Sequence, residues 1–279
     1  MPMQQSTGSD AQLQFHTMNN TFALQNKVAL VTGSGRGIGA AIARVFAEAG
    51  AAVVVNGRTA AQVEAVAAGI RAAGGRAVGI TTDLSDARQL PGLIERTVAA
   101  FGGLDILVNN AGGGLSPPFV DTRIEHLESM FHLGVAVPFE LSRLALPHLL
   151  NRPGASIINT CSPAVRKSPR GFLAHYVSKS ALGALTKLMA ADLGPRVRVN
   201  ALVPGPVKTE QLQSALEKMP DAVREAILGH IRMRRLAAPE EIAYAAVYLA
   251  SPAAAFITGT LLDVGGGDVD EIMPMSPDL

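Results

Sequence analysis

A glycine-rich segment near the start of the chain constrains the fold more than any other feature. Residues 32–39 read Thr-Gly-Ser-Gly-Arg-Gly-Ile-Gly and lie between an apolar run and an amphipathic stretch. Gly33 can adopt a main-chain conformation that is closed to other residues, Gly37 allows close approach to a ligand, and Gly39 allows the following helix to pack close to the strand. The helix N-terminus presents free N–H groups and a positive dipole, which favour phosphate. The segment therefore predicts a strand, a phosphate-binding turn and a helix.

Short apolar runs alternate with longer amphipathic stretches along the rest of the chain. The runs are rich in Val, Ile and Leu without polar alternation, as in strands that are covered on both faces. This order predicts an α/β fold of the doubly wound, Rossmann-like type, with a parallel sheet between two helical layers. The expected strands are 27–31, 52–55, 77–80, 104–108, 155–158, 197–202 and 261–264. The expected helices are 37–49, 60–73, 86–100, 123–150, 173–193 and 239–249.

The chain shows neither an internal repeat nor a low-complexity linker, which favours one domain over residues 27–269. Residues 1–26 are polar and lack the basic start and apolar run of a secretory signal, so we interpret them as a flexible arm. Residues 270–279 form a C-terminal tail, and 207–239 are expected to be a substrate lid. No stretch reaches the roughly 20 apolar residues that span a bilayer. A soluble, cytoplasmic protein is expected.

Composition excludes several kinds of partner. The formal net charge is +1, from 24 basic and 23 acidic residues, which gives no field that would attract nucleic acid or an anionic membrane. Aromatic residues make up 4% and Trp is absent, which argues against a base-stacking surface. Cys161 is the only cysteine, so an intrachain disulfide cannot form and a reducing compartment fits. We expect a small-molecule substrate and assign no metal-binding residues.

Several motifs occur in an order that resembles the short-chain dehydrogenase/reductase family, from about residue 27 to residue 269. The glycines follow a Gly-x-x-x-Gly-x-Gly spacing, residues 109–112 read Asn-Asn-Ala-Gly, and residues 204–209 read Pro-Gly-Pro-Val-Lys-Thr. The resemblance implies a seven-stranded parallel sheet, a nicotinamide dinucleotide cofactor and a homotetramer or homodimer. The cofactor-binding positions that it implies are Gly33, Ser34, Arg36, Gly37, Ile38, Gly39, Arg58, Asp83, Leu84, Asn110, Ala111, Gly112, Lys179, Pro204, Gly205, Val207 and Thr209.

The choice between the two dinucleotides follows from charge at the end of the second expected strand. Enzymes that use NAD place an acidic side chain there, on the ribose hydroxyls. This chain reads Asn56-Gly57-Arg58 and has no carboxylate at that place. Arg58, together with Arg36 of the glycine segment, can pair with a 2′-phosphate, although two solvated surface arginines are the plainer alternative. We predict NADP(H) over NAD(H).

The reaction site departs from the family pattern, which uses Asn, Ser, Tyr and Lys. Lys179 and Ser162 match their places. Counting thirteen residues from Ser162, or four back from Lys179, reaches His175, where the family has Tyr. Tyr176 is the alternative, but one helical step rotates a side chain by about 100°. His132 is predicted to replace the Asn.

A histidine in this place suggests altered acid–base chemistry. Burial and the charges of Lys179 and an oxidised nicotinamide lower a histidine pKa, and a neutral imidazole still donates one N–H to a carbonyl. Apolar residues in the lid favour an apolar substrate. Residues 110–119 and 265–267 resemble 7α-hydroxysteroid dehydrogenases, which implies a steroid-like or cyclic alcohol or ketone. Two alternatives remain open: a dinucleotide-binding protein without ketone reductase activity, and a C=C reductase or lyase.

Overall fold

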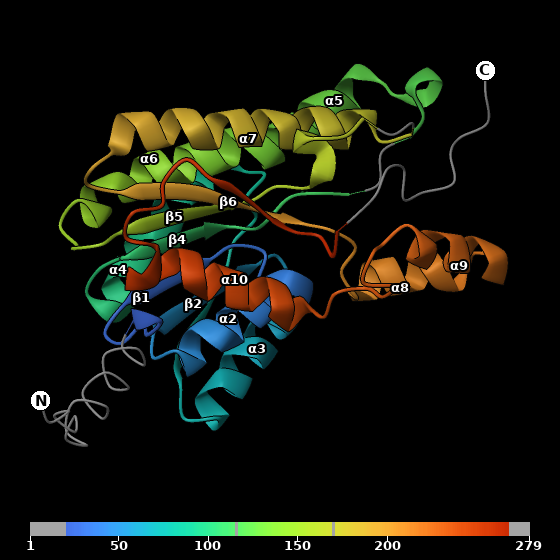
Figure 1. Cartoon of the computed structure of the whole chain (residues 1–279). Helices are drawn as coiled ribbons and strands as arrows, with labels where there is room; N and C mark the ends of the chain where they lie inside the picture. Colours follow the sequence, from blue (N-terminus) through green and yellow to red (C-terminus); the bar gives the residue numbers. More distant parts are fainter. Residues whose placement is uncertain (1–20, 115–116, 169–170, 268–279) are drawn as a thin grey trace, which may run out of the picture.

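A parallel seven-stranded sheet forms the centre of the molecule in the computed structural model, which describes residues 21–114, 117–168 and 171–267. The strand order is β3-β2-β1-β4-β5-β6-β7, which confirms the predicted doubly wound α/β fold (Figure 1). The strands are β1 Val28–Val31, β2 Ala52–Gly57, β3 Arg76–Thr81, β4 Ile106–Asn109, β5 Ser156–Thr160, β6 Arg198–Pro204 and β7 Leu261–Val264.

Helices cover both faces of the sheet and complete the three layers (Figure 1). On one face lie α2 Gly37–Glu48, α3 Ala60–Ala72 and α10 Pro239–Ala250. On the other lie α4 Leu90–Phe101, α6 Val137–Leu149 and α7 Leu173–Leu193, with α5 Ile124–Phe131 beside α7. The other short helices among the described residues are α8 Glu210–Glu217 and α9 Asp221–Gly229 of the predicted lid, with the turns η1 Ala87–Gln89, η2 Phe119–Asp121, η3 His132–Ala136, η4 Pro163–Val165 and η5 Pro252–Ala254.

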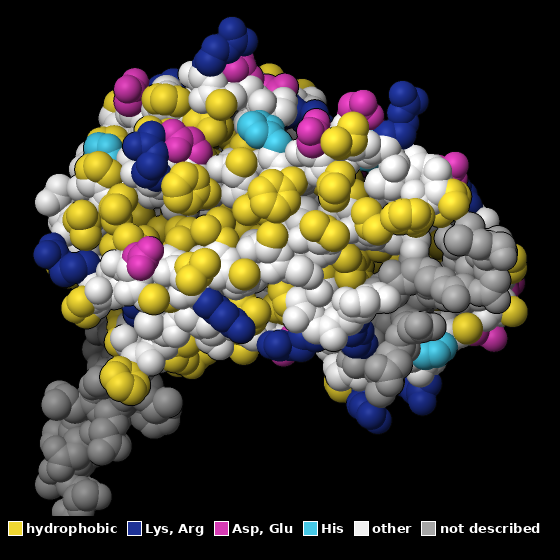
Figure 2. Space-filling model, turned by 90° about the horizontal axis from the view of Figure 1, so that it is seen from above, with side chains coloured by type: hydrophobic (Ala, Val, Ile, Leu, Met, Phe, Trp, Pro, Cys, Tyr) yellow, Lys and Arg dark blue, Asp and Glu magenta, His cyan; other side chains and the backbone are white. Residues whose placement is uncertain are grey.

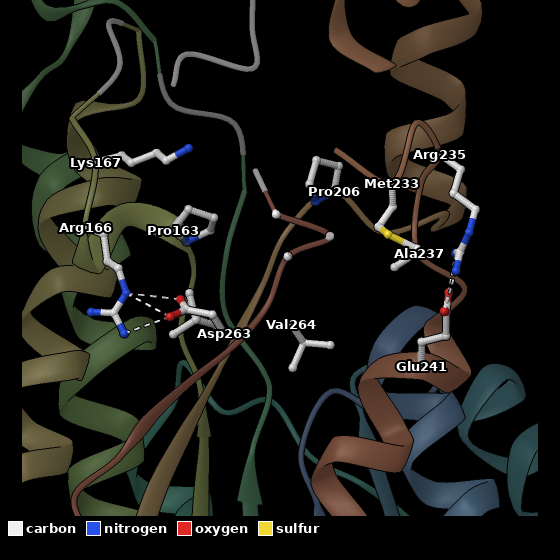
Figure 3. A pocket seen from close by; sticks show the side chains of 14 residues that line it. Pro163, Arg166, Lys167, Pro206, Met233, Arg235, Ala237, Glu241, Asp263 and Val264 are labelled. Atoms are coloured by element: carbon white, nitrogen blue, oxygen red, sulfur yellow. Dashed lines mark hydrogen bonds and ion pairs between the residues drawn. The ribbon is translucent and has the colours of Figure 1, made fainter. Parts of the chain in front are cut away.

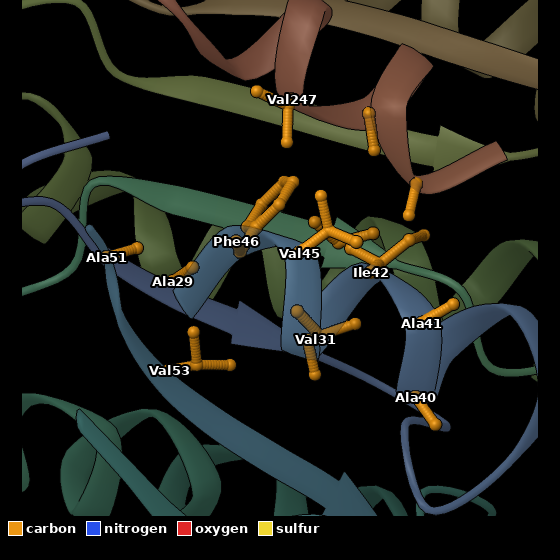
Figure 4. Close-up of a cluster of buried hydrophobic side chains, with 14 of the residues drawn as sticks. Ala29, Val31, Ala40, Ala41, Ile42, Val45, Phe46, Ala51, Val53 and Val247 are labelled. Atoms are coloured by element: carbon orange, nitrogen blue, oxygen red, sulfur yellow. The ribbon is translucent and has the colours of Figure 1, made fainter. Parts of the chain in front are cut away.

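The strands are apolar throughout because they are buried on both faces. In β1, Ala29 and Val31 pack under α2, whereas Leu30 between them packs under α4 and α6. On α2, Phe46 and Ile42 are fully buried and meet α10 (Figure 4). Side chains that alternate between two hydrophobic cores leave no polar face, which explains the absence of polar alternation in the sequence.

The predicted helix 123–150 is divided in the structure. The α5 helix ends at Phe131, the π-helical turn η3 follows, and α6 begins at Val137. Val137 N–H donates to the carbonyl of His132, five residues back. Pro138 has no N–H to donate to Gly134, and glycine is itself a weak helix former, so the regular ladder of hydrogen bonds is interrupted here. The predicted helix therefore continues over residues 124–149, with a π-helical turn at its centre that periodicity did not predict.

The packed domain begins before Lys27, the predicted boundary. Leu24 is 1% exposed within the core on the α2 side, and its N–H donates to Ala49 O at 2.8 Å. Residues 1–20 of the predicted arm and the tail at 270–279 lie outside the described residues. Within the part of the chain that the structure describes, no helix combines the length and apolar character that a membrane crossing requires.

Candidate dinucleotide and reaction site

A cavity of about 500 Å³ opens at the carboxyl ends of the strands, between the glycine segment and the loop after β4. The strand order reverses between β1 and β4, and in doubly wound sheets ligands bind at this point. Among the predicted cofactor residues, those that line the cavity are Gly33, Arg36, Gly37, Ile38, Gly39, Arg58, Asp83, Leu84, Asn110, Ala111, Gly112 and Thr209. The cavity therefore unites most of the predicted dinucleotide site.

The glycines are required by close main-chain contacts. Gly33 has φ +62°, and a Cβ atom there would lie 2.9 Å from Ala111 Cα. A Cβ atom at Gly39 would lie 2.4 Å from Gly33 O and 2.5 Å from Asn110 Nδ2. Larger side chains would push α2 away from β1, so these positions bring the N-terminus of α2 to the cavity with its N–H groups free for a phosphate.

Buried polar contacts fix the glycine segment to the loop after β4. Thr32 Oγ1 donates to Val108 O at 3.1 Å and accepts the N–H groups of Asn110 and Ala111 at 2.9 and 3.0 Å. Asn110 Nδ2 donates in return to Thr32 O and Gly33 O at 3.0 and 3.2 Å. Because all these donors and acceptors are internal, the cavity wall is built before any ligand binds.

Ser34 was predicted to contact the cofactor, but the structure places its side chain elsewhere. Its side chain is fully buried, its Oγ donates to Val31 O at 2.6 Å, and it accepts the N–H of Asn56 at 2.9 Å. The hydroxyl thus joins β1 to β2 beneath the glycine turn and does not line the cavity. Val207 is likewise only 4% exposed and packs in the core on the α2 side.

At the β2 end, the cavity presents cations. Arg36 and Arg58 are exposed and both line it, whereas Asn56 is buried and donates through Nδ2 to Ile80 O at 3.0 Å. The neighbouring carboxylate, Asp83, accepts the N–H and Oγ–H of Ser85, and these bonds lower its pKa, with Arg58 adding a smaller effect. An anionic group placed between the two arginines would meet fork-shaped donors.

The predicted reaction residues meet where β5 ends and α7 begins. Lys179 is 4% exposed and its Nζ donates to Thr160 O at 2.7 Å. Ser162 follows β5 and its Oγ accepts the N–H of Ala164 at 3.1 Å. His175 lies four residues before Lys179 on α7, so both side chains share a helix face. A Cβ atom on Gly113, which lines the cavity, would lie 3.7 Å from His175 Cε1, so the imidazole lies next to a residue of the cavity wall, although His175 does not itself line the cavity.

The charge state of this cluster follows from its burial. Burial, and secondly the charge of Lys179, lowers the pKa of His175 from 6.5 to about 4, so the imidazole is neutral at pH 7. Burial also lowers the pKa of Lys179. The adjacent Cys161 is 3% exposed, and burial raises the pKa of its thiol to about 11. The thiol is therefore protonated and unsuited to act as a nucleophile.

Tyr176, the alternative to His175, has other neighbours. Its ring lies 5.8 Å from the Phe172 ring and 5.7 Å from the His175 imidazole, between centroids. The ring that lies close to Gly113 is that of His175. The helical geometry thus agrees with the residue spacing in placing His175 beside the cavity.

The position of His132 does not support its predicted role as the replacement for the family's Asn. Its Nε2 lies 3.0 Å from Ser85 O, which directs the ring to the segment after β3. The buried residue of η3 is Gly134, where a Cβ atom would lie 2.1 Å from Ser178 Oγ on α7. Sequence spacing missed Gly134 because a π-helical turn changes which residue faces the neighbouring helix. The Gly-x-x-x-Pro pattern at 134–138 is the feature of the sequence that could have indicated this turn.

Comparison with known proteins agrees with this geometry. The family model described as enoyl-(acyl carrier protein) reductase matches residues 33–268. The chain is 36% identical to 7α-hydroxysteroid dehydrogenase of Escherichia coli K12 over 255 residues, covering 91% of this chain and 98% of that protein. It is 37% identical to human dehydrogenase/reductase SDR family member 4 over 248 residues, covering 88% of each.

Solved structures give the same result. A 7α-hydroxysteroid dehydrogenase in complex with NADH and 7-oxo glycochenodeoxycholic acid has a TM-score of 0.86 and 36% identity, over 91% of this chain and 98% of that one. A gluconate 5-dehydrogenase from Burkholderia cenocepacia J2315, with NADP and tartrate, has a TM-score of 0.83 and 32% identity, over 90% and 98%. The fold and the cavity define an oxidoreductase that uses a nicotinamide dinucleotide. The chain belongs to the short-chain dehydrogenase/reductase family, as its motifs predicted.

Proposed function

We propose that the protein is an NADP(H)-dependent oxidoreductase that interconverts a secondary alcohol and a ketone, on an apolar or cyclic compound. The observation that carries the proposal is the position of His175, which lies next to Gly113 of the dinucleotide cavity and one helical turn from Lys179. Gluconate and steroid dehydrogenases among the similar structures support alcohol–ketone chemistry.

The preference for NADP(H) rests on the two exposed arginines in the cavity. Arg36 and Arg58 would hold the 2′-phosphate, because guanidinium groups bind phosphate with forked donors and β2 ends without a carboxylate. Asp83 and Leu84 would contact the adenine, and Lys179 the nicotinamide ribose. Thr209, with Pro204 and Gly205 before it, would contact the nicotinamide amide. When bound, this cofactor supplies or accepts the hydride.

His175 would act on the carbonyl oxygen of the substrate. Its neutral imidazole donates one N–H, and Ser162 Oγ–H donates a second hydrogen bond to the same oxygen. In the alcohol-forming direction the imidazole N–H gives its proton to that oxygen while the other ring nitrogen takes a proton from water, so the imidazole stays neutral and hydroxide is left in the solvent. Gly134 offers no side chain to this cluster.

A substrate panel tests the proposal. Loss of NADPH absorbance is followed with cyclic ketones and, separately, with enones. We expect turnover of a ketone, and a fall in kcat/KM of at least about 100-fold in His175→Ala, the usual range for removal of a general acid. His148→Ala on α6 is the matched control and should retain activity. A lack of turnover across the ketones, with NADPH binding demonstrated, would refute the ketone reductase.

A second candidate is a dinucleotide-binding protein that lacks ketone reductase activity. It is favoured by the pKa of His175, about 4, since an imidazole that stays neutral is a weak proton donor. His175→Tyr discriminates: ketone reduction gained from none supports this candidate. The enone arm of the panel tests the third possibility, a C=C reductase, which the description of the matching family model supports.

For assembly, we propose a homotetramer or homodimer in the cytoplasm. Apolar side chains gather on the face over α5, α6 and α7 (Figure 2), where Phe131, Phe139, Val177 and Leu188 are 43%, 49%, 46% and 66% exposed. Apolar surface of this kind is typical of subunit interfaces. Light scattering should give the mass of two or four chains, and a monomer at micromolar concentration would contradict the proposal.

A further inference from the structure

The turn η4 directly follows Ser162 and is a single turn of three residues, Pro163–Val165. Before the turn the sheet fixes the chain, since Cys161 N–H donates to a carbonyl of β6. Beyond it, Pro163 and Arg166 line a second cleft, of about 470 Å³, so open space lies against this side of the turn (Figure 3). The position of Ser162 therefore depends on the contacts that hold η4.

The turn also sets the direction of the Ser162 hydroxyl. Ser162 Oγ accepts the N–H of Ala164 at 3.1 Å, and Ser162 O accepts the N–H of Val165 at 3.2 Å. With one lone pair of Oγ engaged, the hydroxyl still has its O–H to donate, and the proposed reaction uses this O–H on the substrate oxygen. A shift of η4 would turn the hydroxyl away from that oxygen.

The helix α7 holds η4 on its buried side. Ser180 Oγ donates to Ala164 O at 2.7 Å. Val165 packs against α7 at Gly183, where a Cβ atom would lie 2.7 Å from Val165 Cγ1. Because α7 also carries His175, these contacts fix the turn relative to the imidazole. The two groups that the proposed reaction places on one oxygen are thus joined through α7.

On the cleft side, Arg166 ties the turn to the edge strand β7. Its Nε donates to Asp263 Oδ1 and Oδ2 at 3.1 and 3.0 Å (Figure 3). Its Nη2 donates to Leu261 O at 3.0 Å. An exposed ion pair adds little to stability on its own, but here a planar guanidinium meets a carboxylate and a main-chain carbonyl together, which fixes its direction. The contact therefore constrains the geometry of the turn more than it stabilises the fold.

We propose that Arg166 is a positioning residue for the reaction. With Asp263 it holds η4 from the cleft side, and the turn then aims Ser162 Oγ–H at the oxygen that His175 also contacts. The inference rests on the proposed function, since it requires Ser162 to act on a substrate. A misplacement of about 1 Å costs on the order of 100-fold in rate. Loss of the ion pair should therefore lower kcat and leave the affinity for NADPH unchanged, because Arg166 lines the second cleft and not the dinucleotide cavity.

Hydrogen exchange tests the hold on η4 without reference to activity. The variant Asp263→Ala leaves the sequence of the turn unchanged, and mass spectrometry follows exchange at the amides of residues 164–167. The matched control is Glu64→Ala on α3. Glu64 pairs with Arg71, which also donates to Ala77 O on β3, the other edge strand, and the Glu64 side chain is 60% exposed where that of Asp263 is 55%.

Exchange at 164–167 should be at least about fivefold faster in Asp263→Ala, because the turn opens more often once its tie to β7 is lost. It should be unchanged in Glu64→Ala. Circular dichroism verifies that both variants are folded. Native exchange rates at 164–167 in Asp263→Ala would overturn the proposal.

A double-mutant cycle tests whether Arg166 acts through Ser162. With saturating NADPH and a ketone that the native protein reduces, Arg166→Ala should lower kcat about tenfold. Arg166→Lys keeps the charge and should recover part of the loss. In a Ser162→Ala background the same Arg166→Ala should cost less than about twofold, because the group that it positions is gone. Arg71→Ala is the control and should leave kcat unchanged.

Two kinetic results would refute the positioning role. One is an equal loss of kcat with and without the Ser162 side chain, and the other is a loss that appears as weaker NADPH binding. A native protein that binds NADPH and reduces no ketone would instead refute the proposed function, and with it the action of Ser162 on a substrate. The exchange experiment still decides in that case whether Arg166 and Asp263 hold η4.

Discussion

Protonation of His175 gives the stability of the fold a specific dependence on pH. Its pKa is lowered from 6.5 to about 4 in the folded protein, first by burial and then by Lys179. Between these pH values the unfolded chain binds the proton and the folded chain does not. The free energy of unfolding therefore rises with pH through this window: the contribution is fully present above the unfolded pKa and is lost as pH falls towards 4.

The magnitude follows from the pKa values. One pKa unit corresponds to about 1.4 kcal/mol, so the full displacement amounts to about 3 kcal/mol, of which about 2 kcal/mol falls between pH 7 and pH 5. The His175→Gln variant lacks the titrating group. Its free energy of unfolding should therefore fall by about 2 kcal/mol less than that of the native protein between pH 7 and pH 5. A shallower pH dependence in the variant is thus the signature of a half-buried, desolvated neutral imidazole.

Urea unfolding followed by circular dichroism measures this difference. Both proteins are unfolded at pH 7 and pH 5, at one fixed protein concentration, because subunit association contributes to stability. His148→Gln on α6 controls for the loss of a histidine as such. If native and His175→Gln proteins lose the same free energy between the two pH values, the imidazole is not desolvated and the reasoning about its protonation state fails.

Three further substitutions test the cavity and the η3 turn. Arg58→Ala should weaken NADPH binding by about 10- to 100-fold, the worth of one charge-assisted hydrogen-bonded contact, and leave NADH binding nearly unchanged; calorimetry that shows equal losses for both would contradict the assignment. Gly39→Ala should abolish tight NADPH binding, because its Cβ atom would lie 2.5 Å from Asn110 Nδ2, and an unchanged dissociation constant in a folded variant would count against it. Gly134→Asn should destabilise the fold by about 1–3 kcal/mol, since its Cβ atom would meet Ser178 Oγ at 2.1 Å; adding Ser178→Gly should restore most of the loss of Tm, and no loss in the single variant would refute the contact.

Most of the fold is readable from the sequence because its cause is local. Val53 and Val55 pack on one face of β2, and Val54 packs on the other. An apolar run in the sequence therefore predicts a strand that is covered on both faces. The glycine turn is equally readable, since Gly33 and Gly39 stand where the main chain leaves no room for a side chain.

The prediction errors arise where the direction in which a side chain points, rather than its residue type, decides its role. Ser34 sits inside the glycine turn, but its hydroxyl joins β1 to β2 and faces away from the cavity. His132 is offset by the π-helical turn, which no 3.6-residue periodicity contains. Gly113 was not singled out because its importance lies in contact with His175, a residue 62 positions further on in the sequence.

The most direct test of the account observes the His175 imidazole as the dinucleotide binds. With histidines labelled with ¹³C at Cε1, and the resonance of His175 assigned by its absence in His175→Gln, NADP⁺ is added at a series of pH values. A resonance that shifts on addition of NADP⁺ and keeps the position of a neutral imidazole from pH 8 to pH 5 is the predicted result. A resonance that ignores NADP⁺ under saturating conditions, or that titrates near the ordinary pKa of histidine, would contradict the account.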